Sequence, residues 1–423
     1  MRFASRFRAS RTAALLSAVV LAAGLQLGTA PEAAAAVSEG PVFNKPTGTV
    51  EEQQAIRTRL LTFIGTAAPG SDIKVAMYHL WDEEVARALA DAHTARGVDV
   101  QVMLDNSSST STTDGSYGIL EDALGTDRSQ SSFVGTCPPK QSCLGDPDVL
   151  PSNGLNHNKF WLFSQVDGAS DLVVQSSSNM SPSAYSRMWN NAFLLPFNVP
   201  LYTAYTNYFA DLKAMDWRAW TYSSTTASPF KVYFFPYPGS GNGKDTIWNI
   251  LDKVTCSYTS GGVTRQTKVR VAVLRLTRQG VAEKLTALQK AGCSVDVVYA
   301  ETDSAASTGA PGTWEALHAS GGPSVRCYNW DEDGDPGTTN SVVHSKYLLI
   351  DGKYDGAVNK VLWTGSHNYS GPSLRENDEA LLKVDDSAYH DAYVGNFDAV
   401  KAAAVPGTAD GTDACKGVTG TAD

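Results

Sequence analysis

The stretch "IKVAMYHLWDEEVARALADAHTARGVDVQVML", residues 73–104, decides the fold. Its spacing of apolar residues is typical first of a strand, then of a helix, and then of a strand again. Its first and last runs alternate and are rich in β-branched residues, which predicts two strands. Between them, Val85, Leu89 and Ala92 recur at helical spacing, and Gly97 stands where a helix would end. This strand–helix–strand unit predicts a sheet covered by helices.

The same unit occurs again about 195 residues later, as "VRVAVLRLTRQGVAEKLTALQKAGCSVDVVY" over residues 269–299. Val281, Leu285 and Leu288 show the same helical spacing, and Gly292 again stands where a helix would end. We therefore expect an α/β protein with two similar lobes, each a mixed β-sheet flanked by helices. A Ser/Thr stretch followed by aromatic residues and Pro, residues 221–239, marks the boundary.

The first 36 residues have the pattern of a secretory signal. Four arginines open the chain, residues 13–27 form a short apolar run, and Ala-x-Ala triplets follow it. This run is shorter than the ~20 apolar residues that span a bilayer. We expect cleavage near Ala36 and a secreted protein with an N-terminal lobe at residues 37–225 and a C-terminal lobe at residues 226–423.

The charge balance argues against a duplex-binding protein. The chain has 34 Lys and Arg against 44 Asp and Glu, a net charge of −10. Removal of the leader would take away four Arg and one Glu and make the mature chain more negative still. A broad basic footprint is therefore excluded, although a local basic groove remains open.

The cysteine count fits an exported protein. There are six cysteines, and an even number in such a chain predicts three disulfide bonds. Cys137 and Cys143 flank a short segment and should staple one loop. Cys256, Cys293, Cys327 and Cys415 allow three pairings, among which the sequence does not choose.

Each half also carries a His-x-Lys motif at the head of an apolar run. The two copies are "LNHNKFWLFS" at residues 155–164 and "VVHSKYLLID" at residues 342–351. A strand sends alternate side chains to one face, so His and Lys project together. A Ser-x-Asn motif follows each copy at the end of the neighbouring expected strand. The candidate site residues are His157, Lys159, Ser177 and Asn179 in the first half and His344, Lys346, Ser366 and Asn368 in the second.

Two such sets facing each other would suit phosphodiester cleavage without a metal or another cofactor. One imidazole attacks phosphorus and forms a phosphohistidine, while the other donates a proton to the leaving alkoxide and then activates water. The lysine and asparagine donors would stabilise charge on the phosphate oxygens. The other five histidines are expected to be structural, and His367, within "GSHN", borders the pocket.

These doubled motifs resemble the phospholipase D superfamily, and the signal-bearing form resembles its secreted actinobacterial members. The resemblance covers about residues 73–382 and implies two α/β lobes related by a pseudo-twofold axis, with the site between them. It implies that His157 and His344 are the nucleophile and acid pair and that both lysines and both asparagines bind phosphate. Ser177 and Ser366 would support the site.

The first half departs from the family pattern. The second half has Asp351 after its His-x-Lys, where it would support the site, whereas the first has Ser164 there, and Ser176 replaces the usual Gly before Ser-x-Asn. Downstream, Glu379 fits the carboxylate that orients the second-half histidine. The first half has only Asn190 and Asn191, and Asn191 is the candidate acceptor from His157. We expect His157 to be the nucleophile and His344 the acid.

The acidic loop "DEDGDPG", Asp331–Gly337, invites a calcium interpretation because Asp331, Asp333 and Asp335 alternate. An EF-type loop needs Gly at its sixth place and Glu at its twelfth, and Pro336 and Val342 stand there instead. A solvated loop is the favoured interpretation, and no metal site is expected.

The motifs indicate the chemistry but not the substrate, because one fold serves many substrates. The acidic chain, its aromatic residues and its expected export favour phospholipid headgroup hydrolysis, with transfer to an alcohol where alcohol competes with water. A secreted metal-independent nuclease and a degenerate phosphate-ester-binding protein remain alternatives. We expect a monomer that acts on a phospholipid or other phosphodiester. Residues 233–239 with Trp217 and Trp220 offer peripheral membrane contact, although packing between the lobes explains them more simply.

Overall fold

A computed structural model describes residues 37–148, 154–239, 242–304, 312–332, 335 and 338–406. The expected leader, Cys415 and part of the Asp331–Gly337 loop lie outside these ranges. The described residues fall within one compact unit of the chain. Among them, no helix has both the length and the apolar character needed to cross a membrane.

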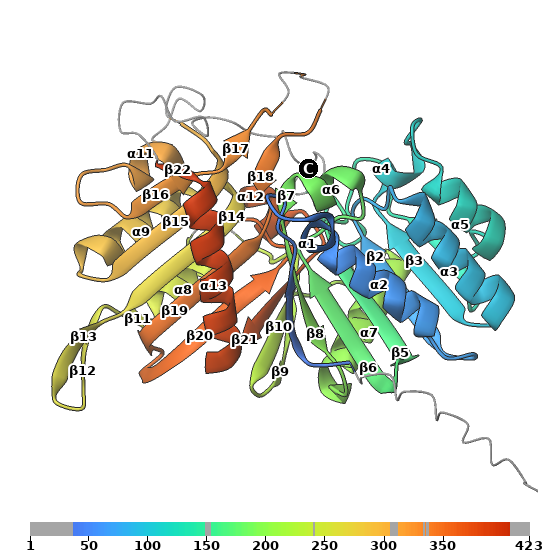
Figure 1. Ribbon diagram of the computed structural model, residues 1–423, viewed down its shortest axis with the longest axis horizontal. Coiled ribbons are helices and arrows are strands. Elements are labelled where there is room, and N and C mark those ends of the chain that lie inside the picture. Colours follow the sequence, from blue (N-terminus) through green and yellow to red (C-terminus); the bar gives the residue numbers. More distant parts are fainter. Residues whose placement is uncertain are drawn as a thin grey trace, which may run out of the picture. The chain divides into compact units, whose positions relative to one another are not determined.

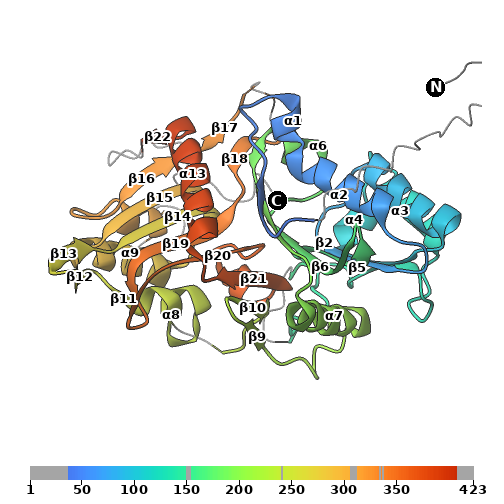
Figure 2. The same ribbon diagram turned by 60° about the horizontal axis from the view of Figure 1, so that its bottom comes forward.

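The first lobe is a mixed seven-stranded sheet with helices on both faces (Figure 1). Figure 2 shows α2 and α3 on one face and α7 on the other. In sheet order its strands are β1 (Gly40–Phe43), β8 (Asn191–Leu195), β6 (Ala169–Ser176), β5 (Lys159–Val166), β2 (Asp72–Met77), β3 (Asp99–Leu104) and β4 (Phe133–Thr136). Its helices are α1 (Val50–Gln53), α2 (Ala55–Thr66), α3 (Glu83–Arg96), α4 (Asn106–Ser109), α5 (Ser116–Leu124), α6 (Pro182–Ser186) and α7 (Val199–Ala214).

Local sequence explains the unit β2–α3–β3 that was predicted. Asp82 caps α3 by accepting from the backbone of Glu84 and Val85, and Gly97 ends it in the left-handed conformation, with φ 68°. The apolar positions Val85, Leu89 and Ala92 are buried against the sheet, as their helical spacing predicted.

The second lobe is built on a ten-stranded sheet. In order, its strands are β22 (Val405–Pro406), β16 (Ser324–Cys327), β15 (Ser294–Thr302), β14 (Lys268–Leu276), β19 (Lys346–Tyr354), β20 (Ala357–Gly365), β21 (Glu379–Val384), β10 (Phe230–Phe235) and β9 (Ser223–Ala227), with β11 (Val254–Thr255) beside β19. Its helical elements are η1 (Asn242–Lys244), α8 (Thr246–Asp252), α9 (Gln279–Lys290), α11 (Thr313–Leu317), α12 (Gly371–Arg375) and α13 (Ser387–Ala403). A hairpin of β12 (Ser257–Ser260) and β13 (Val263–Gln266) extends from this lobe.

The two sheets share one strand order. The series β8-β6-β5-β2-β3-β4 of the first lobe matches β21-β20-β19-β14-β15-β16 of the second. The predicted fold of two similar α/β lobes is confirmed. The expected division between residues 225 and 226 falls inside β9, an edge strand of the second sheet.

The lobes are joined by backbone pairing and by a shared core. A small sheet of β17 (Asn329–Trp330), β18 (Ser341–Val343) and β7 (Met188–Trp189) takes strands from both halves. A buried apolar cluster also runs from the first lobe into the second. The short strand before His344 therefore lies next to the strand that precedes Asn190.

Disulfide bonds join Cys137 to Cys143 and Cys256 to Cys293, so the expected loop staple is confirmed. Cys327 is disulfide-bonded as well.

Candidate active site

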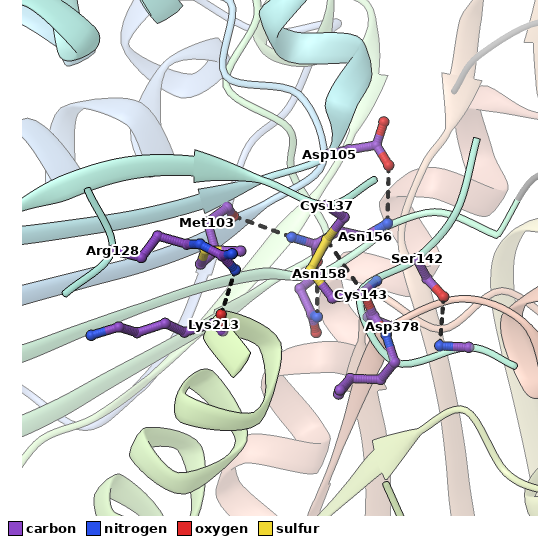
Figure 3. Close-up of a disulfide and its surroundings, with 12 residues drawn as sticks. Met103, Asp105, Arg128, Cys137, Ser142, Cys143, Asn156, Asn158, Lys213 and Asp378 are labelled. Carbon is purple, nitrogen blue, oxygen red and sulfur yellow. Dashed lines mark hydrogen bonds between the residues drawn. A yellow bond between two sulfur atoms is a disulfide. The ribbon is translucent and has the colours of Figure 1, made fainter. Parts of the chain in front are cut away.

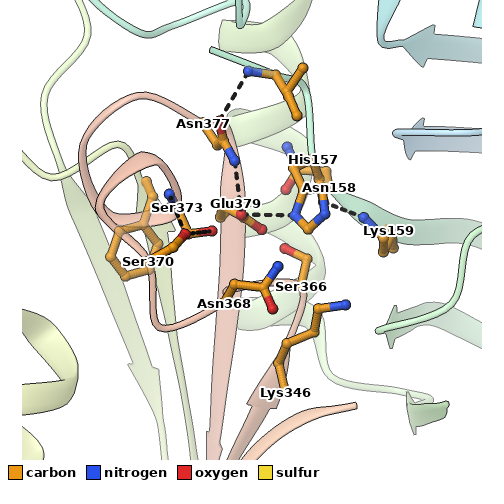
Figure 4. A network of polar contacts seen from close by, with 12 residues as sticks. His157, Asn158, Lys159, Lys346, Ser366, Asn368, Ser370, Ser373, Asn377 and Glu379 are labelled. Atoms are coloured by element: carbon orange, nitrogen blue, oxygen red, sulfur yellow. Dashed lines mark hydrogen bonds and ion pairs between the residues drawn. The ribbon is translucent and has the colours of Figure 1, made fainter. Parts of the chain in front are cut away.

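In each sheet, the motif residues lie at the ends of neighbouring strands, on the same edge of that sheet. Lys159 and Lys346 are the first residues of β5 and β19, and Ser177 and Ser366 directly follow β6 and β20. Because β5–β6 and β19–β20 are antiparallel pairs, the start of one strand lies beside the end of the next. Figure 4 shows His157 and Lys159 of the first lobe near Lys346, Ser366, Asn368 and Glu379 of the second.

His157 is held by the second lobe. Its Nδ1 lies 2.8 Å from Oε1 of Glu379, and its backbone N–H donates to the carbonyl oxygen of Asp378 at 3.0 Å. Both His157 and Glu379 are buried. The side chain and the backbone of this histidine are thus fixed by two consecutive residues of the other lobe.

His344 is held by the first lobe in the matching way. Its Nδ1 lies 2.9 Å from Oδ1 of Asn190, and its backbone N–H donates to the carbonyl oxygen of Trp189 at 3.0 Å. The amide of Asn190 is itself oriented, because Nδ2 donates to Ala184 and Oδ1 accepts from Ser177 at 2.8 Å. An acceptor oxygen at Nδ1 places the proton there in both histidines, which directs reaction chemistry to Nε2.

The two lysines make the same backbone contact in both halves. Nζ of Lys159 donates to the carbonyl oxygen of His157 at 3.0 Å, and Nζ of Lys346 donates to that of His344 at 2.7 Å. Lys159 also lies over the ring of Tyr78, and Nζ of Lys346 lies 3.1 Å from both ring nitrogens of His344. Two buried ammonium groups beside two imidazoles form a site for an anion.

The asparagines and serines differ in what they contact. Oδ1 of Asn368 accepts from the backbone N–H of Arg275 at 3.3 Å, while Oδ1 of Asn179 is buried without a hydrogen-bond partner among the described residues. The hydroxyl of Ser177 donates to Asn190, and that of Ser366 accepts from the backbone of Ala380 at 3.1 Å. Both serines therefore hold the segment that carries a histidine partner, which is a supporting position.

Two expectations about the histidine partners need correction. Glu379 contacts His157 of the other lobe, although it was expected to orient His344. Asn191, the expected partner of His157, donates instead to Thr364 at 2.6 Å and Tyr393 at 3.0 Å. The reason is that each lobe presents its partner residue across the junction, where the strands that precede Asn190 and His344 pair.

Asn191 rather than Asn190 was expected to be a histidine partner, although the sequence carries a signal for Asn190. Asn190 lies thirteen residues after Ser177, and Glu379 lies thirteen residues after Ser366. The sheet register agrees, because Ala192 pairs with Ser176 just as Leu381 pairs with Gly365. Counting from the serine therefore identifies Asn190 as the counterpart of Glu379.

Asp351 also needs correction, because it lies away from the site. It stands five residues along β19 from Lys346, which is about 16 Å of extended chain. There it pairs in register with Lys268 and Lys360. A strand carries its far end out of reach of its first residue, so Asp351 cannot touch a phosphate at Lys346.

His367 borders this centre as a buried neutral ring. It packs on Phe235 with ring centroids 4.3 Å apart, and neither ring nitrogen has a hydrogen-bond partner among the described residues. Burial lowers the pKa of His367 well below its usual value, and the charges of Arg278 and His157 lower it further. A ring that stays neutral is unsuited to donate a proton.

The loop closed by Cys137 and Cys143 is anchored on Asp378, the residue before Glu379 (Figure 3). The backbone N–H groups of Cys143 and Leu144 donate to the carboxylate of Asp378 at 2.6 and 3.0 Å. Burial raises the pKa of Asp378 well above its usual value, although these two hydrogen bonds act in the opposite direction. The loop thereby fixes the residue whose carbonyl oxygen binds His157.

Cys137, Cys143 and Asp378 are also the one group in the described ranges with metal-ligand atoms close together. The two sulfurs are bonded to each other, and the carboxylate already accepts two amide hydrogen bonds. This chemistry does not fit a metal site.

The family model described as "Cardiolipin synthase, PLD-like domain" matches residues 60–213 and 264–401. These segments make up more than half of the chain and include every predicted motif residue. The chain belongs to this PLD-like domain family. No curated protein matches the sequence.

Two solved structures with TM-scores above 0.5 share this fold at low identity. Phosphatidylserine synthase from Haemophilus influenzae Rd KW20 is 14% identical over 86% of this chain and 86% of its own, with a TM-score of 0.55. Polyphosphate kinase from Porphyromonas gingivalis is 12% identical over 85% of this chain, with a TM-score of 0.54, and the chain spans 46% of that kinase. The phospholipase D family member Nuc from Salmonella typhimurium is 20% identical over 38% of this chain and 87% of its own, with a TM-score of 0.28.

Proposed function

We propose that this protein is a secreted phosphodiesterase of the phospholipase D type, which hydrolyses the headgroup ester of phospholipids through a phosphohistidine. The observation that carries the proposal is the exchange of histidine partners between the lobes. Glu379 and Asn190 each hold Nδ1 of the other lobe's histidine and so direct both Nε2 atoms to reaction chemistry. A single active centre thus depends on both halves of the chain.

In the first step, Nε2 of His157 attacks phosphorus, and the bond from phosphorus to the headgroup oxygen breaks with its electron pair on that oxygen. His344 donates the Nε2 proton to the departing alkoxide. Lys159, Lys346, Asn179 and Asn368 donate to the non-bridging phosphate oxygens and stabilise the charge that gathers there.

In the second step, His344 accepts a proton from water, and the resulting hydroxide attacks phosphorus while the bond to His157 breaks. Both histidines return to their starting states. An alcohol in place of water yields a new phosphodiester by the same path, which is transphosphatidylation.

The two partners favour His157 as the nucleophile. Attack on phosphorus places positive charge on the imidazole, and the carboxylate of Glu379 stabilises that charge. The neutral amide of Asn190 stabilises a protonated His344 less, so His344 releases its proton to the leaving group more readily.

Phospholipid is the substrate class that the net charge of −10 supports over nucleic acid. The disulfide bonds and the leader-like first 36 residues support export. We therefore also propose that the protein is of the secreted actinobacterial type of phospholipase D. The protein would act as a monomer that touches membrane surfaces peripherally.

The test is to incubate the purified protein, in excess EDTA, with phospholipid micelles and separately with single- and double-stranded DNA. Headgroup release with intact DNA is the expected result, and the His157→Ala and His344→Ala variants should lose it. DNA cleavage with untouched lipid would instead indicate a nuclease. Phosphate-ester binding without turnover would leave only a binding protein.

A further inference from the structure

A pocket of about 430 Å³ lies beside the histidine centre and contains none of its residues. Its walls are mainly aromatic and come from the segment between α7 and β10, the residues after β10, and the end of α12. The residues used here are Trp217, Arg218, Trp220, Tyr222, Tyr237 and Arg375.

Backbone pairing places this pocket close to the reacting groups. Phe235, the last residue of β10, pairs in register with Glu379, the carboxylate that holds His157. Tyr237, which lines the pocket, is only two residues further along, which is at most about 7 Å of chain. A molecule in the pocket would therefore lie within reach of a phosphodiester at the histidines.

The pocket walls are fixed by internal hydrogen bonds. Nε1 of Trp220 donates to the carbonyl oxygen of Pro236 at 3.1 Å. Nη1 of Arg375 donates to the carbonyl oxygens of Tyr237 at 2.8 Å and Pro238 at 3.0 Å. The rings of Tyr222 and Tyr237 meet edge to face at 4.0 Å. The pocket is thus formed before a ligand arrives, as most small-molecule sites are.

The lining combines apolar faces with positive charge. The guanidinium of Arg218 lies over the ring of Trp217 at 4.1 Å, and that of Arg375 over the ring of Tyr237 at 5.7 Å. Asp146 is the one carboxylate on the wall. Two guanidinium groups against one carboxylate select an acidic ligand, and the aromatic faces select one with an apolar body.

We propose that this pocket binds an anionic phospholipid, so that substrates with an acidic headgroup are preferred over zwitterionic ones. The inference rests on the proposed lipid hydrolysis. The guanidinium groups would bind the acidic group and the aromatic rings the glycerol portion. A polynucleotide is disfavoured because it needs a continuous basic track, whereas the chain carries a net charge of −10 and offers a single pocket here.

The variant Arg218→Glu tests the pocket, because Arg218 is exposed and its charge faces the ligand. Arg265→Glu is the matched control, since Arg265 is equally exposed on the distant β13 hairpin. The measured quantity is the ratio of kcat/KM for dihexanoyl phosphatidylserine, whose headgroup carries a carboxylate, to that for dihexanoyl phosphatidylcholine, whose headgroup carries none. Arg218→Glu should lower this ratio about tenfold through loss of a charge-assisted contact, and Arg265→Glu should leave it unchanged.

Binding to the His157→Ala variant separates this inference from the proposed function, because it needs no turnover. Calorimetric titration should show dihexanoyl phosphatidylserine binding that the added Arg218→Glu change weakens about tenfold. An equal ratio and equal binding in the Arg218 and Arg265 variants would overturn the pocket assignment. Preferential binding of adenosine monophosphate would overturn the lipid assignment. If the wild-type protein hydrolyses no lipid while binding follows the prediction, the proposed function alone fails.

Discussion

At the scale of single residues, Asn190 makes the two halves of the centre unequal. It stands where the second half has Glu379, so one histidine has a carboxylate partner and the other an amide. Restoring the carboxylate should make His344 hold its proton more strongly, because an opposite charge at this distance favours the protonated ring.

Asn190→Asp is therefore expected to move the alkaline limb of the kcat/KM profile upward by about one pH unit. The measurement is a pH–rate profile from pH 5 to 9 on a soluble phosphodiester. Glu379→Gln, which weakens the partner of His157, should instead lower kcat without this upward shift. A profile that Asn190→Asp leaves in place would mean that His344 is not the proton donor.

His367 gives a second prediction, about stability and pH. Burial lowers the pKa of His367 in the folded protein. At mildly acidic pH this histidine therefore binds a proton in the unfolded chain but stays neutral in the folded protein. The wild-type protein therefore loses unfolding free energy as the pH falls below the ordinary histidine value. His367→Phe keeps a ring against Phe235 but has no group to protonate. Its unfolding free energy should therefore rise by up to about 2 kcal/mol relative to that of the wild type between pH 7.5 and pH 5.

Urea unfolding of both proteins at pH 7.5 and pH 5 measures that difference. Any packing change from the larger ring would be similar at both pH values and would cancel. A difference between the two proteins that stays constant with pH would show that the folded protein protonates His367.

At the scale of elements, the starts of α3 and α9 carry the same ion pair with its charges exchanged. Asp82 caps α3 and pairs with Arg57 of α2 at 2.6 Å. Arg278, at the same place before α9, pairs with Asp245 before α8 at 2.7 Å. The repeat therefore preserves the contact between these helices while the residue types change.

Removal of one partner should be costly, because both ions are largely buried. Burial opposes ionisation of Asp82, but hydrogen bonds from Arg57, Tyr185 and the Val85 backbone outweigh it and lower its pKa. Asp82→Asn should reduce the unfolding free energy by about 3 kcal/mol at pH 7. The deficit should begin to shrink as the pH falls below about 4, where Asp82 of the unfolded chain takes up a proton, and it should vanish only below the lowered pKa of Asp82 in the folded protein.

The control for this variant is Asp91→Asn, which removes a charge from the exposed face of the same helix and should change stability by less than about 0.5 kcal/mol. Chemical denaturation at pH 7 and pH 3.5 compares the three proteins. Equal losses in both variants would assign the effect to net charge rather than to the pair with Arg57.

At the scale of the whole molecule, the spacing of apolar residues along the sequence predicted the strands, the helices and the doubled lobes correctly. Residues 73–104 fold locally, since neighbouring residues settle their structure. The contacts of His157 and His344 instead span more than 150 positions and depend on how the lobes meet. Spacings within one half identify Asn190 and Glu379 as counterparts but do not show how the halves meet, which is why Glu379 was assigned to the histidine of its own half.

The central claim is that both lobes build one centre in which His157 is the nucleophile and His344 the acid and base. A substrate with a 4-nitrophenolate leaving group needs no proton for departure, so His344→Ala should complete the first step and stall before the second.

The decisive measurement is rapid mixing of His344→Ala with bis(4-nitrophenyl) phosphate, followed by mass analysis of the quenched protein. We expect a burst of about one 4-nitrophenolate per protein and a phosphoryl adduct on His157, with no burst from His157→Ala. A burst from His157→Ala with the adduct on His344 would reverse the two roles. Turnover by the wild-type protein without an adduct on either histidine would contradict the account.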